Sequence, residues 1–205
     1  MRIGVIADTH CPEFLDELPA AVFEKLRGVD LILHAGDVGG EQTLARLREL
    51  APVEAVRGDH DPELGRLPRR RLVEVGGRRI GLVHGNRSRF LEEPITLVST
   101  LTLGLFWLRL GRGRWLRRQF PEADVIVYGH THRARLEQVD GAIVFNPGAV
   151  YQVTVPEVRR RLERGPSWFE WCWLQVIRHR KDGPVRSVGV LEIGDGVRAA
   201  VLPLG

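Results

Sequence analysis

The chain has 205 residues, of which 43% are hydrophobic and 27% are charged, and its formal net charge is +4 at pH 7. This composition predicts one globular domain with a sizeable core, and it excludes the disordered and fibrous classes. The two cysteines exclude a disulfide framework and a four-thiolate metal site, and so low a count favours a reducing compartment.

The sequence predicts neither secretion nor a membrane span. It does not begin with a basic segment followed by an apolar stretch and a cleavage site. Its longest run without a charged residue, 94–108, falls short of the roughly 20 apolar residues that a membrane-spanning helix needs. We therefore expect a cytoplasmic protein.

Five short runs rich in aliphatic and β-branched residues predict buried strands. In chain order they are 3–7, 31–35, 53–56, 80–83 and 125–128. Between the first three runs, apolar residues recur at helical spacing over 12–27, where Phe14 and Leu18 begin the stripe, and over 41–50. Alternation of strands and helices favours an α/β sheet.

The later part of the chain has a different pattern, which predicts hairpins. Gly76–Gly77, Asp140–Gly141 and Gly194–Gly196 each lie between alternating apolar stretches. The predicted fold is therefore α/β, with two packed mixed β-sheets flanked by helices. We expect a single domain over residues 1–205.

Each of the five predicted strands ends in aspartate or histidine. Because ligands of open α/β sheets bind outside the carboxyl ends of the strands, these side chains should converge on one site. Carboxylate and imidazole donors together suit Mn²⁺, Fe or Zn²⁺ better than Mg²⁺ or Ca²⁺. His34 precedes its motif by three residues, and we expect it to be packed instead of ligating. The converging residues are Asp8, His10, Asp37, Asp59, His60, His84, His130 and His132.

This ordered series of motifs resembles that of the calcineurin-like metallophosphoesterases, and most closely that of their small bacterial and archaeal phosphodiesterase branch. The resemblance covers about residues 1–85, 121–150 and 185–205. It rests on Asp8-x-His10, Gly36-Asp37, Gly58-Asp59-His60-Asp61, Val83-His84-Gly85, Gly129-His130-Thr131-His132 and Asn146-Pro147-Gly148-Ala149.

The resemblance implies a site for two divalent metal ions, most readily Mn²⁺, with Fe or Zn²⁺ as alternatives. Asp8, His10, Asp37 and His132 would hold the first ion, and Asp37 would bridge to a second held by Asp59, His84 and His130. His60 matches the family's proton donor to the leaving group, and its neighbour Asp61 is a candidate to orient it.

The implied function is hydrolysis of a phosphate ester, most readily a phosphodiester, by a metal-bridging hydroxide. Two alternatives remain open: a non-catalytic scaffold on the same fold, and a membrane-surface hydrolase of a lipid-linked phosphate. The complete ligand set and His60 favour the enzyme over the scaffold.

Asp59 departs from the family pattern, which has asparagine at this position. The extra carboxylate removes one positive charge from the site and replaces an amide that could hold a phosphate oxygen. We expect the site to bind metal at least as tightly and to attract a phosphate anion less strongly.

Two segments, at about 86–119 and 151–183, are longer than the family pattern requires, and we interpret them as insertions. They contain all five tryptophans and carry net charges of +5 and +3, which leaves the rest of the chain at −4. We expect them to meet as one helical, aromatic surface near the rim of the site. Internal packing, a homo-oligomer interface and contact with a membrane surface remain open. A nucleic-acid partner ranks low because the rest of the chain is acidic.

Overall fold

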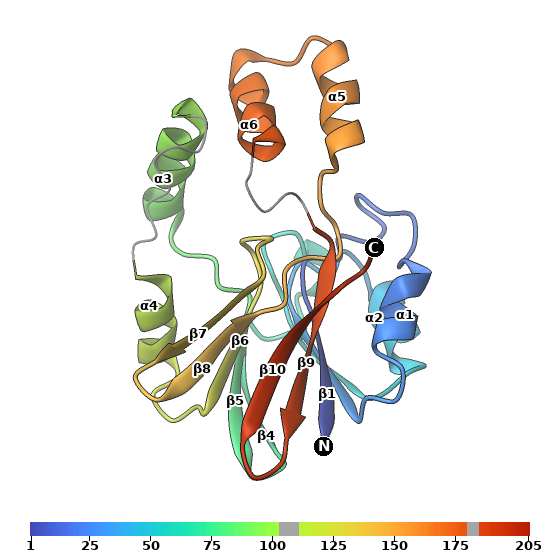
Figure 1. Cartoon of the computed structure of the whole chain (residues 1–205), viewed down its shortest axis with the longest axis vertical. Coiled ribbons are helices and arrows are strands. Elements are labelled where there is room, and N and C mark those ends of the chain that lie inside the picture. The colour runs from blue at the N-terminus through green and yellow to red at the C-terminus, as the bar shows by residue number, and fades with distance from the viewer. Residues whose placement is uncertain (103–110, 180–184) are drawn as a thin grey trace. The chain divides into compact units, whose positions relative to one another are not determined.

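The computed structural model describes residues 1–102, 111–179 and 185–205 (Figure 1). The chain divides into two compact units. Unit 1 comprises residues 1–86, 111–151 and 186–205, and unit 2 comprises 87–110 and 152–185. A single domain with insertions at 86–119 and 151–183 stays a prediction.

Unit 1 contains two five-stranded mixed sheets. The first sheet has the order β10-β9-β1-β2-β3. Its central strands β1, β2 and β3 are parallel, whereas β9 is antiparallel to both β1 and β10. The strands are β1 (Arg2–Ile6), β2 (Leu31–Ala35), β3 (Val53–Val56), β9 (Ser187–Ile193) and β10 (Val197–Pro203).

The second sheet has the order β4-β5-β6-β8-β7. Strands β5, β6 and β8 are parallel, and hairpins add β4 and β7 at the two edges. The three predicted hairpins therefore form β4–β5, β7–β8 and β9–β10. Asp140 and Gly141 both have positive φ, as a tight hairpin turn requires. The strands are β4 (Arg70–Val75), β5 (Arg78–Val83), β6 (Val125–Tyr128), β7 (Arg135–Val139) and β8 (Ala142–Asn146).

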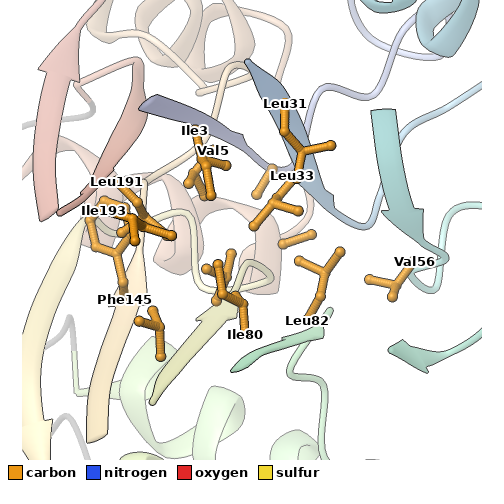
Figure 2. Packing of buried hydrophobic residues seen from close by; sticks show 14 residues of the cluster. Ile3, Val5, Leu31, Leu33, Val56, Ile80, Leu82, Phe145, Leu191 and Ile193 are labelled. Atoms are coloured by element: carbon orange, nitrogen blue, oxygen red, sulfur yellow. The ribbon is translucent and has the colours of Figure 1, made fainter. Parts of the chain in front are cut away.

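The main core of unit 1 lies between the two sheets, because alternate residues of each sheet point toward the other. Figure 2 shows side chains of β1 and β2 facing those of β5 and β8. The predicted fold class, two packed mixed sheets flanked by helices, is confirmed. The core includes Ile3, Val5, Leu31, Leu33, Ile80, Leu82, Phe145 and Leu191.

Three helices of unit 1 pack on the outer faces of the sheets. Helices α1 (Ala20–Lys25) and α2 (Glu41–Arg48) cover the first sheet with Val22, Leu26 and Leu47. Helix α4 (Arg112–Gln119) covers the second sheet with Leu116. Trp115 also packs there, so this part of the predicted insertion belongs to unit 1.

The predicted helix at 12–27 is wrong over its first half, because α1 begins only at Ala20. Pro19 lies just before the helix, where its missing N–H costs nothing. The segment ahead of it bonds to distant parts of the chain: the backbone N–H of Cys11 donates to the Val38 carbonyl, and the hydroxyl of Thr43 in α2 donates to the Cys11 carbonyl. Phe14 therefore lies in a loop.

Unit 2 is helical, with α3 (Arg89–Leu101), α5 (Val155–Glu163) and α6 (Trp168–Arg178). Helix α6 contacts both α3 and α5, and Figure 1 shows α5 and α6 side by side. Thr154 and Ser167 cap α5 and α6, since each side chain accepts a backbone N–H three residues ahead. None of the helices in the described parts of the chain is long and apolar enough to cross a membrane.

Candidate metal centre

The candidate site is built on loops that leave the strand ends of unit 1 in strained conformations. Six described residues other than glycine have φ in the left-handed region, and five of them are predicted ligands. Such conformations persist where the surrounding structure fixes them, and they cluster at functional sites. These ligands are Asp8, His10, Asp37, His130 and His132, with φ between 48° and 67°.

Asp8, His10 and His132 form one group of donors. Each offers a ligand atom, and the three atoms lie within 4.8 Å of one another. Asp8 is completely buried, and the backbone N–H of His130 donates to both of its carboxylate oxygens at 3.0 Å. The Asp8 carboxylate is therefore fixed at the start of the loop that carries the two histidines.

Asp59, His84 and His130 form a second group within the same distance limit. The side-chain amide of Asn86 donates to one oxygen of Asp59 at 2.8 Å. Nδ1 of His84 lies 2.9 Å from the Ala35 carbonyl. With Nδ1–H as the donor in that bond, Nε2 of His84 is available as a metal ligand.

Asp37 lies between the two groups. One of its oxygens is 3.5 Å from Nε2 of His10 and 3.3 Å from Nε2 of His84. Its other oxygen accepts the backbone N–H of His60 at 3.0 Å. A Cβ on Gly58 would clash with the Asp37 side chain at 2.0 Å, so only glycine allows this approach. All seven predicted ligands thus lie in overlapping groups; their metal-binding role stays a prediction.

Two buried nitrogens indicate that the site suits a metal. Nε2 of His10 and Nε2 of His84 are both buried and lack a hydrogen-bond partner in the described structure. An unsatisfied buried polar atom is costly. A metal ion at each group of donors would satisfy these atoms, and carboxylate with imidazole is a donor set that transition metals accept.

The electrostatics of the metal-free site reflect buried charges. Burial raises the pKa of Asp8 to about 8, opposed by the positive charge of His84. Burial acts to lower the pKa of His84, but contact with Asp37 and the charge of Asp8 raise it to about 9. Burial lowers the pKa of His132 to about 3. Protons on Asp8 and His84 would leave on metal binding.

Hydrogen bonds fix the loops that carry the candidate ligands. They come from side chains whose roles the sequence did not predict. The hydroxyl of Thr9 bonds to His34 and to the Val38 carbonyl. His34 is completely buried, in agreement with its expected packing role. The side-chain amide of Asn146 donates to the Gly129 carbonyl at 2.7 Å. The Asn-Pro-Gly motif therefore positions the loop that carries His130.

The expectation that Asp61 orients His60 is wrong. Asp61 is buried, and its two oxygens accept the backbone N–H groups of Gly39 and Gly58, both at 2.8 Å. The carboxylate beside the His60 ring comes instead from Glu13, 3.0 Å from Nδ1. Glu13 was not predicted as a site residue, because the apolar pattern at 12–27 assigned it to a helix. Its position three residues after His10 was the available signal.

Comparison with known proteins shows the family to which the chain belongs. Residues 1–160 match the calcineurin-like phosphoesterase superfamily domain. A protein of Methanothermobacter thermautotrophicus named "Probable metallophosphoesterase" is 40% identical over 161 residues, covering 77% of this chain and 83% of that protein. A probable metallophosphoesterase of Methanocaldococcus jannaschii is 35% identical over 204 residues, covering 100% of this chain and 82% of that protein.

Solved structures support the same fold. A single mutant of Vps29 from Entamoeba histolytica superposes with a TM-score of 0.65 at 23% identity and 99% coverage of both chains. A structure described as a novel archaeal phosphodiesterase superposes with a TM-score of 0.54 at 20% identity, covering 98% of this chain and 100% of that one.

The fold and the clustered donors agree with the metallophosphoesterase names of these relatives. The chain belongs to the calcineurin-like phosphoesterase superfamily.

Proposed function

We propose that the protein is a dinuclear-metal phosphoesterase that hydrolyses a phosphodiester. The observation that carries the proposal is the position of Asp37, whose carboxylate lies beside donors of both groups. A single carboxylate between two sets of aspartate and histidine donors suits a pair of divalent ions. Mn²⁺ fits this mixed donor set best, with Fe or Zn²⁺ as alternatives.

The proposed ligands are those assigned from the family motifs. Asp8, His10 and His132 hold one ion, Asp59, His84 and His130 hold the other, and Asp37 serves both. Such a pair of ions, when bound, activates water and stabilises the charge that develops on attacking and leaving oxygens.

His60 is placed to act on the leaving group. Its ring lies at the edge of the donor cluster, within 4.8 Å of atoms from His10 and Asp37, and its side chain is 46% exposed. An exposed imidazole beside a buried site can reach a substrate and donate a proton at near-neutral pH. His60 would therefore protonate the departing oxygen.

The charge of the site bears on the choice between a diester and a monoester. Asp8, Asp37, Asp59 and the bridging hydroxide together place four negative charges against the four positive charges of two divalent ions. A site without net positive charge gives no electrostatic advantage to the doubly charged monoester over the singly charged phosphodiester. We therefore propose a small phosphodiester as the substrate.

Metal analysis and hydrolysis assays test this function. The Mn²⁺-loaded protein should hold two ions per chain and hydrolyse bis(para-nitrophenyl) phosphate faster than para-nitrophenyl phosphate. Asp37→Ala is the matched inactive control. Two bound ions without hydrolysis of any phosphate ester would overturn the enzyme and support the scaffold. A preference for the monoester would overturn the diester assignment.

A second candidate function, action at a membrane surface, rests on unit 2. Eight described apolar side chains on the helices of this unit are exposed, and Trp168 is 69% exposed. Aromatic residues with flanking arginines favour the headgroup region of a bilayer. The exposed apolar residues are Phe90, Leu97, Val98, Leu101, Val155, Trp168, Phe169 and Trp171.

The net positive charge of unit 2 favours an anionic lipid surface as its partner. Its sequence contains ten basic and six acidic residues. Arg159, Arg160 and Arg164 are exposed on or next to α5, and Arg178 is exposed at the end of α6. Contact of this kind with a membrane surface would make a lipid-linked phosphate ester available as a substrate for the same hydrolysis.

Vesicle binding by the full chain tests this candidate. The protein should co-sediment with phosphatidylglycerol vesicles and not with phosphatidylcholine vesicles, and about 1 M salt should weaken binding by screening. Combined Trp168→Ser and Trp171→Ser should abolish binding, whereas Leu136→Ser, at an exposed position of β7, should not. A lipid-independent dimer that ignores vesicles would overturn the candidate and make unit 2 a self-association surface.

A further inference from the structure

The loop between β1 and α1 carries a carboxylate that contacts two histidines of the candidate site. Both oxygens of Glu13 lie near Nδ1 of His60, at 3.0 and 3.1 Å. One of them also lies 3.3 Å from Nδ1 of His10. Glu13 itself is not among the groups of described residues that could hold a metal.

The donor and acceptor atoms of this contact determine which nitrogen of His60 carries a proton. A carboxylate can only accept, so Nδ1 of His60 must carry the proton in this bond. Nε2 is then the ring nitrogen that remains to serve a substrate. In histidine the partner of one nitrogen determines the role of the other.

We propose that Glu13 is the positioning residue for His60, an inference that rests on the proposed function. By accepting a hydrogen bond from Nδ1–H, the Glu13 carboxylate fixes the ring orientation. The imidazolium form of His60 then delivers its Nε2 proton to the leaving oxygen and becomes the neutral ring that is protonated at Nδ1. Glu13 does not touch the substrate in this role, and it acts through His60.

The other carboxylates near His60 are already engaged. Asp61 binds two backbone N–H groups, and Asp59 accepts from the Asn86 amide. Among the described residues, Glu13 is the carboxylate hydrogen-bonded to the His60 side chain.

Because the His60 ring is exposed, neighbouring groups must restrict its orientation, and the surrounding aromatic rings do so only in part. The His60 ring packs edge-on against His10 with a centroid distance of 4.8 Å, and against Phe14 at 5.9 Å. Ring contacts restrict the tilt of an imidazole but do not determine which nitrogen bears the proton. The hydrogen bond to Glu13 supplies that selection.

The contact between Glu13 and His10 suggests a different role, support of a metal ligand. Outer carboxylates that orient ligating histidines raise metal affinity, and their loss costs about 10–100-fold in affinity or activity. Loss of support for the candidate ligand His10 would reduce the metal content and slow the hydrolysis of every substrate. Loss of His60 positioning would leave metal content unchanged and slow only substrates that need a proton.

A double-mutant cycle on the Mn²⁺-saturated enzyme separates the two roles. Glu13→Ala should lower kcat on an alkyl phosphodiester by no more than the about 10²–10⁴-fold that loss of a general acid costs, and leave kcat on bis(para-nitrophenyl) phosphate nearly unchanged. In a His60→Ala background the same substitution should have no further effect. Glu13→Gln, which keeps an acceptor oxygen, should restore part of the activity. Glu17→Ala, at an exposed acidic position of the same loop, is the matched control.

Equal losses on both substrates, additivity with His60→Ala or a lower metal content would overturn the proposal and assign Glu13 to His10. A second readout does not require activity. Proton–nitrogen NMR of the metal-free protein should show His60 protonated at Nδ1, and Glu13→Ala should shift it toward the Nε2–H tautomer. An unchanged tautomer would overturn the proposal. If the wild-type protein hydrolysed no phosphate ester but Glu13→Ala still shifted the His60 tautomer, the proposed function alone would be overturned.

Discussion

The side-chain amide of Asn146 donates a hydrogen bond to the main-chain carbonyl of Gly129, 2.7 Å away, and thereby joins the end of β8 to the loop after β6. The opposite end of the same amide accepts the backbone N–H of Gly148. Asn146 is completely buried. One side chain therefore fixes two turns, and one of them carries the ligand His130.

Asn146→Ala should weaken metal binding by about 10–100-fold, as loss of outer support for a ligand does, and should destabilise the protein by about 1–3 kcal/mol because the Gly129 carbonyl loses its partner. Metal titration and urea unfolding measure the two effects. Gln138→Ala removes an exposed amide from β7 and is the control. Unaltered metal affinity would show that the Gly129 loop does not depend on this bond.

Asp37→Ala should lose both metal ions, since its carboxylate lies beside donors of both groups. Asp59→Ala should lose one ion only, because Asp59 belongs to the second group alone. Elemental analysis after Mn²⁺ loading and desalting distinguishes the two variants. Retention of one ion by Asp37→Ala would contradict a shared ligand.

His60→Ala should retain both metals and lose about 10²–10⁴-fold in kcat on an alkyl phosphodiester, the usual size of general-acid catalysis. The loss should be small on bis(para-nitrophenyl) phosphate, whose leaving group departs without a proton. Steady-state kinetics on the two substrates measure the difference. The same loss on both would indicate that His60 binds phosphate.

Asp59→Asn should raise kcat/KM on phosphate esters, because it removes a negative charge from the site and supplies an amide donor. One unit charge at 4 Å is worth about 1 kcal/mol in water, or roughly fivefold. The gain should be larger for a dianionic monoester than for a diester. Assays at saturating Mn²⁺ are needed because the second ion exchanges a charged ligand for a neutral one. A slower variant at saturation would assign the carboxylate a role in the reaction.

The metal-free protein should become less stable as pH rises from 7 to 9. The folded-state pKa values of Asp8 and His84 are raised to about 8 and about 9. The folded protein therefore binds more protons than the unfolded chain in this range, and stability falls with pH. Thermal melts in chelator at pH 7, 8 and 9 measure the trend. Since metal binding displaces these protons, added Mn²⁺ should raise Tm more at pH 9 than at pH 7.

The strands and the clustering of the candidate ligands were predictable from the sequence for one physical reason. Buried parallel strands are short aliphatic runs, and their carboxyl ends meet at one edge. The sequence alone therefore predicts that Asp8 and Asp37 lie in a common site.

The loop after His10 was not predictable, because two signals conflicted there. Phe14 and Leu18 have helical spacing, whereas Pro19 and bonds to distant loops delay the helix until Ala20. Glu13 was missed for the same reason, since its partner His60 lies 47 positions away. Composition likewise placed Trp115 in an insertion, but packing of its helix against the second sheet assigns it to unit 1.

The seven candidate ligands come from both layers of unit 1. Asp8, His10, Asp37 and Asp59 follow strands of the first sheet, and His84, His130 and His132 follow strands of the second. A bound ion would therefore be a crosslink between the layers, added to the apolar packing that already joins them. Free energy gained on binding metal becomes free energy of holding the sheets together. If ions are bound in this way, their removal would weaken the packing between the two sheets and leave the strand pairing within each sheet in place.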